Sequence, residues 1–300
     1  MTAWSRFPLL AAVALGSSAC FAEPRPGPIV DAADPTCPEP LDLSFAPDTG
    51  GADEAYVCFG FDASAFTART VGGVRWEIAT GGGFLVHHAI LYAVAGDFPD
   101  GPTLCDAMPD AARQLHVWSP GGDDLALPSD TGLELPSDTK RFAIQAHTLR
   151  IGTDPPAPSH ARICGGPAAP SNLAALMGMG APVPAIRPMH EEQSSTSCVL
   201  GSALHLYSVW PHMHLVGKEI TLTLARSDGE ATPLVDVVPW DFHLQRTYLL
   251  GVDAGPGDAI DLGCIWDNPT NDYVLPGPKT TDEMCNAAFI AWPAESAFCE

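Results

Sequence analysis

Five histidines and one methionine stand at spacings that could bind metal, in two groups far apart along the chain. The first group is the adjacent pair His87-His88 with His147, and the second is His212 and His214 with Met284. A thioether is a poor ligand for zinc, calcium or magnesium but a good one for Cu(I), so Met284 selects copper. Three imidazoles suit copper and zinc equally. The two groups therefore predict two metal ions, with redox copper as the metal.

The spacing within each group sets a condition on the backbone. Side chains two apart on an extended strand point to the same side, so His212 and His214 can share one ion while Met213 faces away. His87 and His88 would point to opposite faces of a regular strand, so they can share an ion only where the backbone bends. Without further support, each of these motifs fits a structural role about as well as a metal site.

The composition indicates short strands and excludes one class of partner. The chain has 300 residues and 46% hydrophobic content, enough for two cores. Thirty Pro and 28 Gly, without long helical heptads, favour many strands joined by turns. A net charge of -22 argues against a nucleic-acid partner, because phosphate would be repelled over most of the surface.

The N-terminus is typical of an exported protein. Arg6 is followed by the apolar run 7–15 and by small residues leading to Cys20, which predicts a signal peptide over residues 1–19. The small residues resemble a lipoprotein cleavage site, although Ser17 replaces a larger aliphatic residue. We therefore expect a periplasmic or cell-surface protein that contacts the membrane only through a lipid on Cys20. Residues 20–36 are then a flexible tether.

Removing Cys20 from nine cysteines leaves eight, which can pair completely. An even set in an exported chain, with no Cys-x-x-Cys, predicts a disulfide framework, with two disulfides in each half and the connectivity left open. The eight are Cys37, Cys58, Cys105, Cys164, Cys198, Cys264, Cys285 and Cys299.

Alternating and apolar runs of strand length begin near Ala55 and resume after an Ala-, Pro-, Gly- and Met-rich stretch. This pattern predicts an all-β fold of two antiparallel β-sandwich, jelly-roll-like domains, residues 37–166 and 191–300, joined by a linker at residues 167–190.

Four motifs give the sequence a specific resemblance. They are Val86–Tyr92, Ile144–Thr148, His212–Lys218 and Asp282–Asn286, in this order. They resemble the motifs of the ascorbate-dependent copper type II monooxygenases, the family of peptidylglycine α-hydroxylating monooxygenase and dopamine β-monooxygenase. The resemblance covers the chain from about Cys37 to Cys299.

The resemblance implies two β-sandwiches facing across a solvent-filled cleft and a role for each ligand group. His87, His88 and His147 would bind an electron-transfer copper. His212, His214 and Met284 would be catalytic and bind the copper where O2 and substrate react. Ascorbate, or another one-electron reductant, would be the co-substrate in the hydroxylation of a C–H bond. The implied disulfides are Cys37–Cys164, Cys58–Cys105, Cys198–Cys299 and Cys264–Cys285.

The chain departs from the peptide-hydroxylating members near the second group. Trp210 stands where they have an arginine that pairs with the substrate carboxylate, and Ala288 replaces a tyrosine, while Asn286 is kept. Loss of the charged partner favours a less anionic or more apolar small-molecule substrate. We expect Trp210, Asn286 and Gln145 to face this substrate, with an ordinary polar strand residue as the alternative for Gln145.

Two other functions fit the same residues. One is a non-catalytic copper-binding lipoprotein that stores or transfers Cu(I), and the other is a structural β-sandwich with incidental histidines. A second complete ligand group argues against a simple carrier, and we expect a monomeric enzyme. The remaining histidines lack motif partners and are predicted to be surface or core residues: His116, His160, His190, His205 and His243.

Overall fold

The computed structural model describes residues 37–79, 81–105, 107–109 and 112–294. The expected signal peptide, Cys20, the tether and Cys299 lie outside these residues. The described part of the chain contains strands and no α-helix, so it has no helix that could span a membrane. The predicted all-β, largely antiparallel fold is confirmed.

In chain order the strands are β1 (Leu41–Phe45), β2 (Glu54–Asp62), β3 (Thr70–Glu77), β4 (Phe84–Val94), β5 (Thr103–Leu104), β6 (Ala112–Trp118), β7 (Leu125–Ala126), β8 (Thr131–Glu134), β9 (Arg141–Arg150), β10 (Ser159–Gly165), β11 (Asn172–Gly180), β12 (His190–Val199), β13 (Leu204–His212), β14 (Gly217–Ala225), β15 (Ala231–Val237), β16 (Tyr248–Ala254), β17 (Ala259–Asn268) and β18 (Asn286–Trp292).

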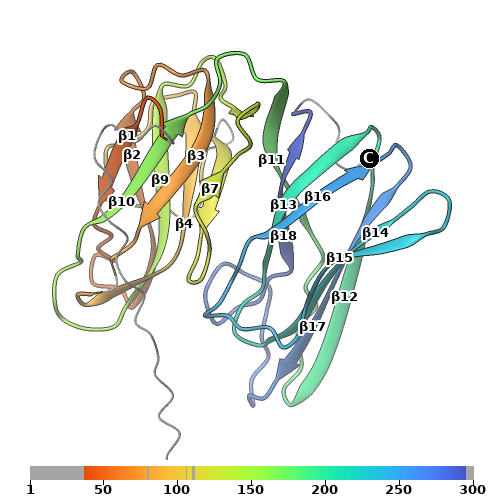
Figure 1. Ribbon diagram of the computed structural model, residues 1–300. Coiled ribbons are helices and arrows are strands. Elements are labelled where there is room, and N and C mark those ends of the chain that lie inside the picture. The colour runs from red at the N-terminus through yellow and green to blue at the C-terminus, as the bar shows by residue number, and fades with distance from the viewer. Residues whose placement is uncertain (1–36, 80, 106, 110–111, 295–300) are drawn as a thin grey trace, which may run out of the picture. The chain divides into compact units, whose positions relative to one another are not determined.

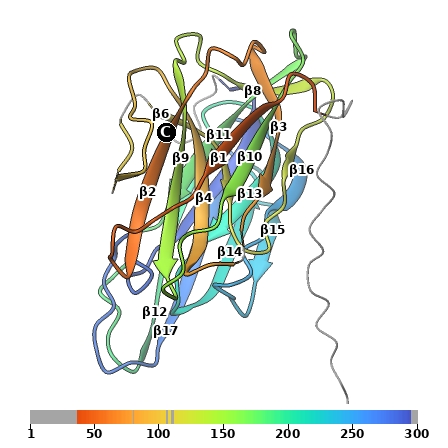
Figure 2. The ribbon, with the colours of Figure 1, turned by 90° about the vertical axis from the view of Figure 1, so that its left-hand side faces the viewer.

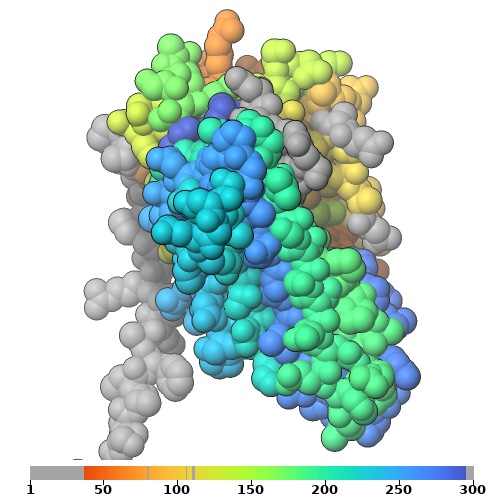
Figure 3. Space-filling model, turned by 90° about the vertical axis from the view of Figure 1, so that its right-hand side faces the viewer, coloured from red at the N-terminus to blue at the C-terminus, as the bar shows by residue number. Residues whose placement is uncertain are grey.

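The strands form three sheets. A five-stranded sheet has the order β5-β2-β9-β4-β6, and its long members β2, β9 and β4 lie side by side in Figure 2. A four-stranded sheet has the order β12-β17-β14-β15, and its residues form much of the face shown in Figure 3. The nine-stranded sheet follows β1-β10-β3-β8-β11-β18-β13-β16, with β7 beside β3 (Figure 1).

Two hydrophobic cores fill the spaces between these sheets. One core gathers residues of β1 to β4, β6, β9 and β10, with Phe142 and Leu91 fully buried. The other gathers residues of β11, β13 to β15, β17 and β18, around Trp266 and Phe289. Each sheet thus buries one face against another sheet, as a sandwich requires.

Residues 172–180, within the predicted linker, form a strand that both cores share. β11 pairs parallel with β8 and antiparallel with β18, so the nine-stranded sheet is continuous through both halves of the chain. Neighbouring residues of a strand face opposite sides, and Ala174 packs in the first core while Ala175 and Met177 pack in the second. The connection is therefore part of the fold that positions the two halves.

Three disulfides brace the described residues: Cys37–Cys164, Cys58–Cys105 and Cys264–Cys285. These are pairs that the resemblance implies. Cys198 is also disulfide-bonded, and its implied partner Cys299 lies outside the described residues.

Candidate metal centre

The first histidine group is assembled by pairing within the five-stranded sheet. His88 on β4 lies opposite His147 on β9, and the register shifts between Val86 and His88. His87 is thus the extra residue of a β-bulge, which turns its ring to the same side as its neighbour. The backbone bend that adjacent histidines need in order to share one ion is therefore present, and it lies at His87. All three rings are buried, and one ligand atom from each lies within 4.8 Å of the others.

The ring nitrogens of this group are arranged for a metal ion. The Nδ1 atoms of His87 and His88 are 3.2 Å apart. Two imidazole nitrogens bound to one metal at about 2.0–2.1 Å would be separated by roughly 3.3 Å at a tetrahedral angle. The Nε2–H of His147 donates to Glu54 Oε1 at 2.6 Å, which leaves His147 Nδ1 buried and without a partner among the described residues.

The second group joins the end of one strand to a distant loop. β13 ends at His212, and the imidazole rings of His212 and His214 are 5.0 Å apart, while Met213 between them is buried in the second core. Asn286 lies opposite His212 in the β13–β18 pair, which brings the preceding Met284 to this end of the sheet. The Asn286 amide contacts the Met284 sulfur at 3.4 Å.

A buried carboxylate holds the two parts of the second group together. Glu283 is 1% exposed and accepts hydrogen bonds from the backbone N–H groups of His214, Val216 and Met284 at 2.8–3.1 Å, and from the Trp266 indole at 3.0 Å. Burial raises the pKa of Glu283, and these four donors oppose that shift. His214 Nδ1 bonds the carbonyl of Asp282, which leaves its Nε2 buried and without a partner among the described residues.

The two histidine groups adjoin each other. The imidazole ring of His212 lies 6.5 Å from that of His87 and 5.8 Å from that of His88, between ring centroids. Phe242 stacks on His87 at 4.0 Å, and the buried Gln245 contacts a histidine of each group. Its Oε1 accepts from His212 Nδ1 at 2.7 Å, and its Nε2 lies 3.2 Å from His87 Nε2.

Burial keeps these imidazoles neutral. It lowers the pKa of His87 to about 2 and that of His212 to about 3, with neighbouring histidines adding to the shift. The pKa values of His88, His147 and His214 are lowered by the same main cause. Neutral imidazole is the form that binds metal ions. Neutral rings and two buried, unpartnered ring nitrogens therefore fit a pair of metal sites.

A cavity of about 610 Å³ opens beside both groups. His88, His212 and Met284 line it together with the three side chains predicted to face a substrate, Gln145, Trp210 and Asn286. The remaining lining residues are Tyr56, Ile90, Gln114, Leu176, Gly178, Met179, Gly180, Pro278, Ala287 and Ala288. Among the described residues that line it there is no Lys, Arg, Asp or Glu.

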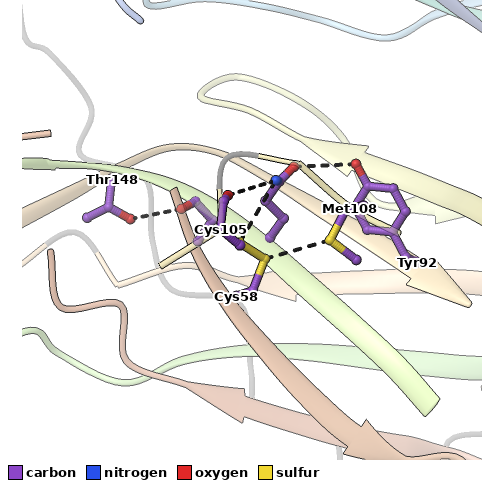
Figure 4. The surroundings of a disulfide bond; sticks show 7 residues. Cys58, Tyr92, Cys105, Met108 and Thr148 are labelled. Atoms are coloured by element: carbon purple, nitrogen blue, oxygen red, sulfur yellow. Dashed lines mark hydrogen bonds between the residues drawn. A yellow bond between two sulfur atoms is a disulfide. The ribbon is translucent and has the colours of Figure 1, made fainter. Parts of the chain in front are cut away.

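Trp210 and Gln145 are fixed by hydrogen bonds. The Trp210 indole stacks on His212 at 4.7 Å and donates to Ser119 Oγ at 3.0 Å. The Gln145 amide donates to the carbonyl of Cys105 at 3.3 Å and accepts from the Tyr92 hydroxyl at 3.4 Å. Figure 4 shows the Cys58–Cys105 disulfide with Met108 and Tyr92 on one side of it.

Sequence reasoning missed four residues that organise the site: Glu54, Tyr56, Gln245 and Glu283. Glu283 lies within the Asp282–Asn286 motif, and its position beside Met284 was the available signal. Glu54 and Tyr56 share one face of a strand, but nothing in the sequence links that face to His147. Two of the other histidines illustrate the core and surface positions expected for them. His116 is buried and accepts from the Trp76 indole at 2.9 Å, and His190 is exposed.

Comparison with known proteins gives a family match for the C-terminal part of the chain. Residues 172–299 match the family model described as "Copper type II ascorbate-dependent monooxygenase, C-terminal domain". The resemblance found in the motifs is thereby confirmed for this part of the chain.

Curated relatives extend the likeness into the N-terminal half. The chain is 25% identical to "DBH-like monooxygenase protein 1" of Mus musculus over 70% of its length and 39% of the relative's. It is 26% identical to the Homo sapiens protein of that name, over 80% and 45% of the two lengths. Dopamine beta-hydroxylase of Bos taurus is 24% identical, over 70% and 42%. The chain thus spans less than half the length of these relatives.

Solved structures give a weaker likeness. The structure of an allantoicase overlaps 84% of this chain and 77% of that one, with 9% identity and a TM-score of 0.20, which is too low to indicate a common fold.

Proposed function

We propose that this protein is a two-copper, ascorbate-dependent monooxygenase that hydroxylates a C–H bond of a small molecule with O2. The observation that carries the proposal is the meeting of two different donor sets at one cavity. One set has three imidazoles, and the other has two imidazoles and a thioether that lines the cavity. A soft sulfur donor favours Cu(I), which is the state that reacts with O2.

The proposed roles of the two sets are those that the family resemblance implies. His87, His88 and His147 would hold the electron-transfer copper, and His212, His214 and Met284 the copper at the reacting centre. Bound copper would supply one-electron redox chemistry and the activation of O2. The short separation of the His88 and His212 rings supports electron transfer between the sets. Glu54 and Gln245 accept hydrogen bonds from ring nitrogens of His147 and His212, which fixes tautomer and orientation. Glu283 positions the second set through the backbone N–H groups of His214 and Met284.

The substrate is a neutral, largely apolar small molecule. The described lining of the cavity has no charged side chain to pair with an ionic group, and Ile90, Leu176 and Met179 contribute apolar surface. Trp210 forms a fixed wall beside His212, because its indole N–H is held by Ser119. Asn286 and Gln145 offer amide groups that orient a hydroxyl or carbonyl of the substrate.

Gln245 makes a different kind of hydrogen bond with each ligand set. Its amide nitrogen also donates to the Phe242 carbonyl at 2.8 Å, so it is a donor toward His87 Nε2. His87 can accept this bond only while its proton is on Nδ1. Ligation through His87 Nδ1 moves that proton to Nε2, where it faces the amide donor, and the contact must be replaced. The bond to His212 Nδ1–H is compatible with ligation through His212 Nε2.

The setting proposed for this activity is outside the cytoplasm. Three disulfides in the described residues fit an oxidising compartment, as expected for an exported protein. Anchoring through a lipid on Cys20 and a monomeric state remain part of the proposal.

Oxygen uptake tests the proposal. The copper-loaded protein, supplied with ascorbate and a panel of neutral aromatic and aliphatic compounds, should consume O2 and form a hydroxylated product. Met284→Ala should abolish this coupled uptake, whereas Met189→Ala, at a methionine that is 67% exposed, should leave it unchanged. Two bound coppers without any ascorbate-dependent uptake would favour the copper-binding lipoprotein. Equal uptake in Met284→Ala would defeat the assignment of the second site.

A further inference from the structure

Strand β2 contacts the first ligand group and the segment that carries Met284 through two of its side chains. Glu54 and Tyr56 are two residues apart, so they point to the same side of the strand. Tyr56 lies opposite His147 in the β2–β9 pair. Both side chains also reach the segment that carries Met284, residues 278–284, which is called the methionine loop below.

Glu54 joins a ligand of the first group to the methionine loop through a single oxygen. Its Oε1 accepts from His147 Nε2 at 2.6 Å, from the Thr280 backbone N–H at 2.7 Å and from the Thr280 hydroxyl at 2.8 Å. Thr280 is 226 positions away in the chain and is buried. Burial raises the pKa of Glu54, but the bonds from Thr280 and His147 more than offset this effect, so the pKa is lowered overall.

Tyr56 makes a second, independent connection between the same two regions. Its ring stacks on the His147 imidazole, with centroids 4.3 Å apart and planes within 3°. Its hydroxyl donates to the Pro278 carbonyl at 2.8 Å. One side chain therefore packs against a first-group ligand and bonds the methionine loop.

The methionine loop needs this support at its far end. Its base is closed by the bonds from Glu283 N–H to Leu275 and from Gly277 N–H to Glu283, and by the four donors on the Glu283 carboxylate. At the tip, Lys279 and Asp282 bond each other through backbone and side chain. Glu54 and Tyr56 bond the tip to strand β2, and His214 bonds the Asp282 carbonyl from the turn after β13.

We propose that Glu54 and Tyr56 are positioning residues that hold the methionine loop against the His147 ligand, so that sulfur ligation at Met284 depends on a strand of the first histidine group. This inference rests on the proposed function, because it takes the two groups as copper sites. It adds that the two sites share a hydrogen-bonded support and that loosening the support weakens the second site selectively.

The double variant Tyr56→Phe/Thr280→Val tests the inference. It removes two hydroxyl groups while keeping the ring stacked on His147 and the Glu54–His147 bond. X-ray absorption of the Cu(I)-loaded protein would report the copper–sulfur contribution, and a competing Cu(I) chelator would report affinity. Loss of supporting hydrogen bonds around a metal typically lowers affinity about 10- to 100-fold. We expect about a tenfold weaker second site, a reduced copper–sulfur signal and an unchanged first site.

Tyr207→Phe is the matched control. It removes a tyrosine hydroxyl that donates to the Ala126 carbonyl at 2.8 Å, far from the methionine loop, and should leave both readouts unchanged. The single variant Tyr56→Phe, which removes one oxygen atom, should show a smaller shift in the same direction. Unchanged affinity and sulfur signal in the double variant would overturn the inference alone. A wild-type protein without any copper–sulfur signal would overturn the proposed second site and this inference with it.

Discussion

The two ligand groups are built by different means. His88 and His147 are fixed by the register of adjacent strands in one sheet, and a single bulge adds His87. His212, His214 and Met284 come from a strand end, the turn after it and a loop about seventy positions later, held by the carboxylate of Glu283. The first group is a property of strand pairing, and the second depends on a few buried side-chain bonds. The second should therefore be the easier to disrupt.

Glu283→Ala should give the largest effect. It would leave four N–H donors, two buried and two part-buried, without an acceptor, at a cost of roughly 1–3 kcal/mol for each buried unsatisfied group before relaxation. We expect a loss of about 4 kcal/mol in the free energy of unfolding, measured with urea, together with loss of the second metal only. Glu230→Ala, at an exposed carboxylate, should change stability by less than about 0.5 kcal/mol. Equal loss of both metals would contradict the conclusion that the second ligand group is the easier to disrupt.

Removal of disulfides should separate stability from metal binding. Cys264–Cys285 closes a span of 21 positions and Cys58–Cys105 one of 47, which the chain-entropy relation converts to about 3 and about 4 kcal/mol. Paired Cys→Ser variants should follow that order in unfolding free energy. The order should reverse for Cu(I) affinity at the second site, because Cys285 adjoins Met284. If the Cys58–Cys105 variant also lost more Cu(I) affinity than the Cys264–Cys285 variant, the Met284 segment would not depend on the Cys264–Cys285 disulfide.

Gln245→Ala should give the smallest of these effects, and opposite ones at the two sites. His212 would lose its Nδ1–H acceptor, which should weaken the second site about tenfold. At the first site the variant removes an amide donor that opposes the ligated tautomer of His87, so affinity there should stay equal or rise. Separate Cu(I) titrations of Gln245→Ala in His87→Ala and His212→Ala backgrounds would measure each site. Parallel weakening of both sites would refute the tautomer argument.

The sequence predicted the parts of the fold that depend on local pattern. Strand alternation and turns indicated the all-β class, and the motifs led to the residues now found around one cavity. The need for a bend at His87-His88 followed from strand geometry and appears as a bulge. β11 escaped prediction because its Ala-, Gly- and Met-rich sequence resembles a connection, although alternate residues serve two cores.

Long-range contacts position the site residues that the sequence did not predict. Glu54 and His147 are 93 positions apart, Glu54 and Thr280 are 226 apart, and Gln245 and His87 are 158 apart. Glu54, Thr280 and Gln245 are ordinary polar residues in their local context, and the role of each depends on a distant partner. That role appears only when strand register and loop packing bring the partner into range, and neither can be derived from composition or periodicity.

Copper stoichiometry is the decisive measurement for the pair of sites. We expect two coppers per chain in the wild-type protein, about one in His212→Ala and about one in His147→Ala, with the sulfur-ligated copper absent only from His212→Ala. Binding of a single zinc, or loss of both metals in either variant, would contradict a pair of copper sites with separate ligand sets.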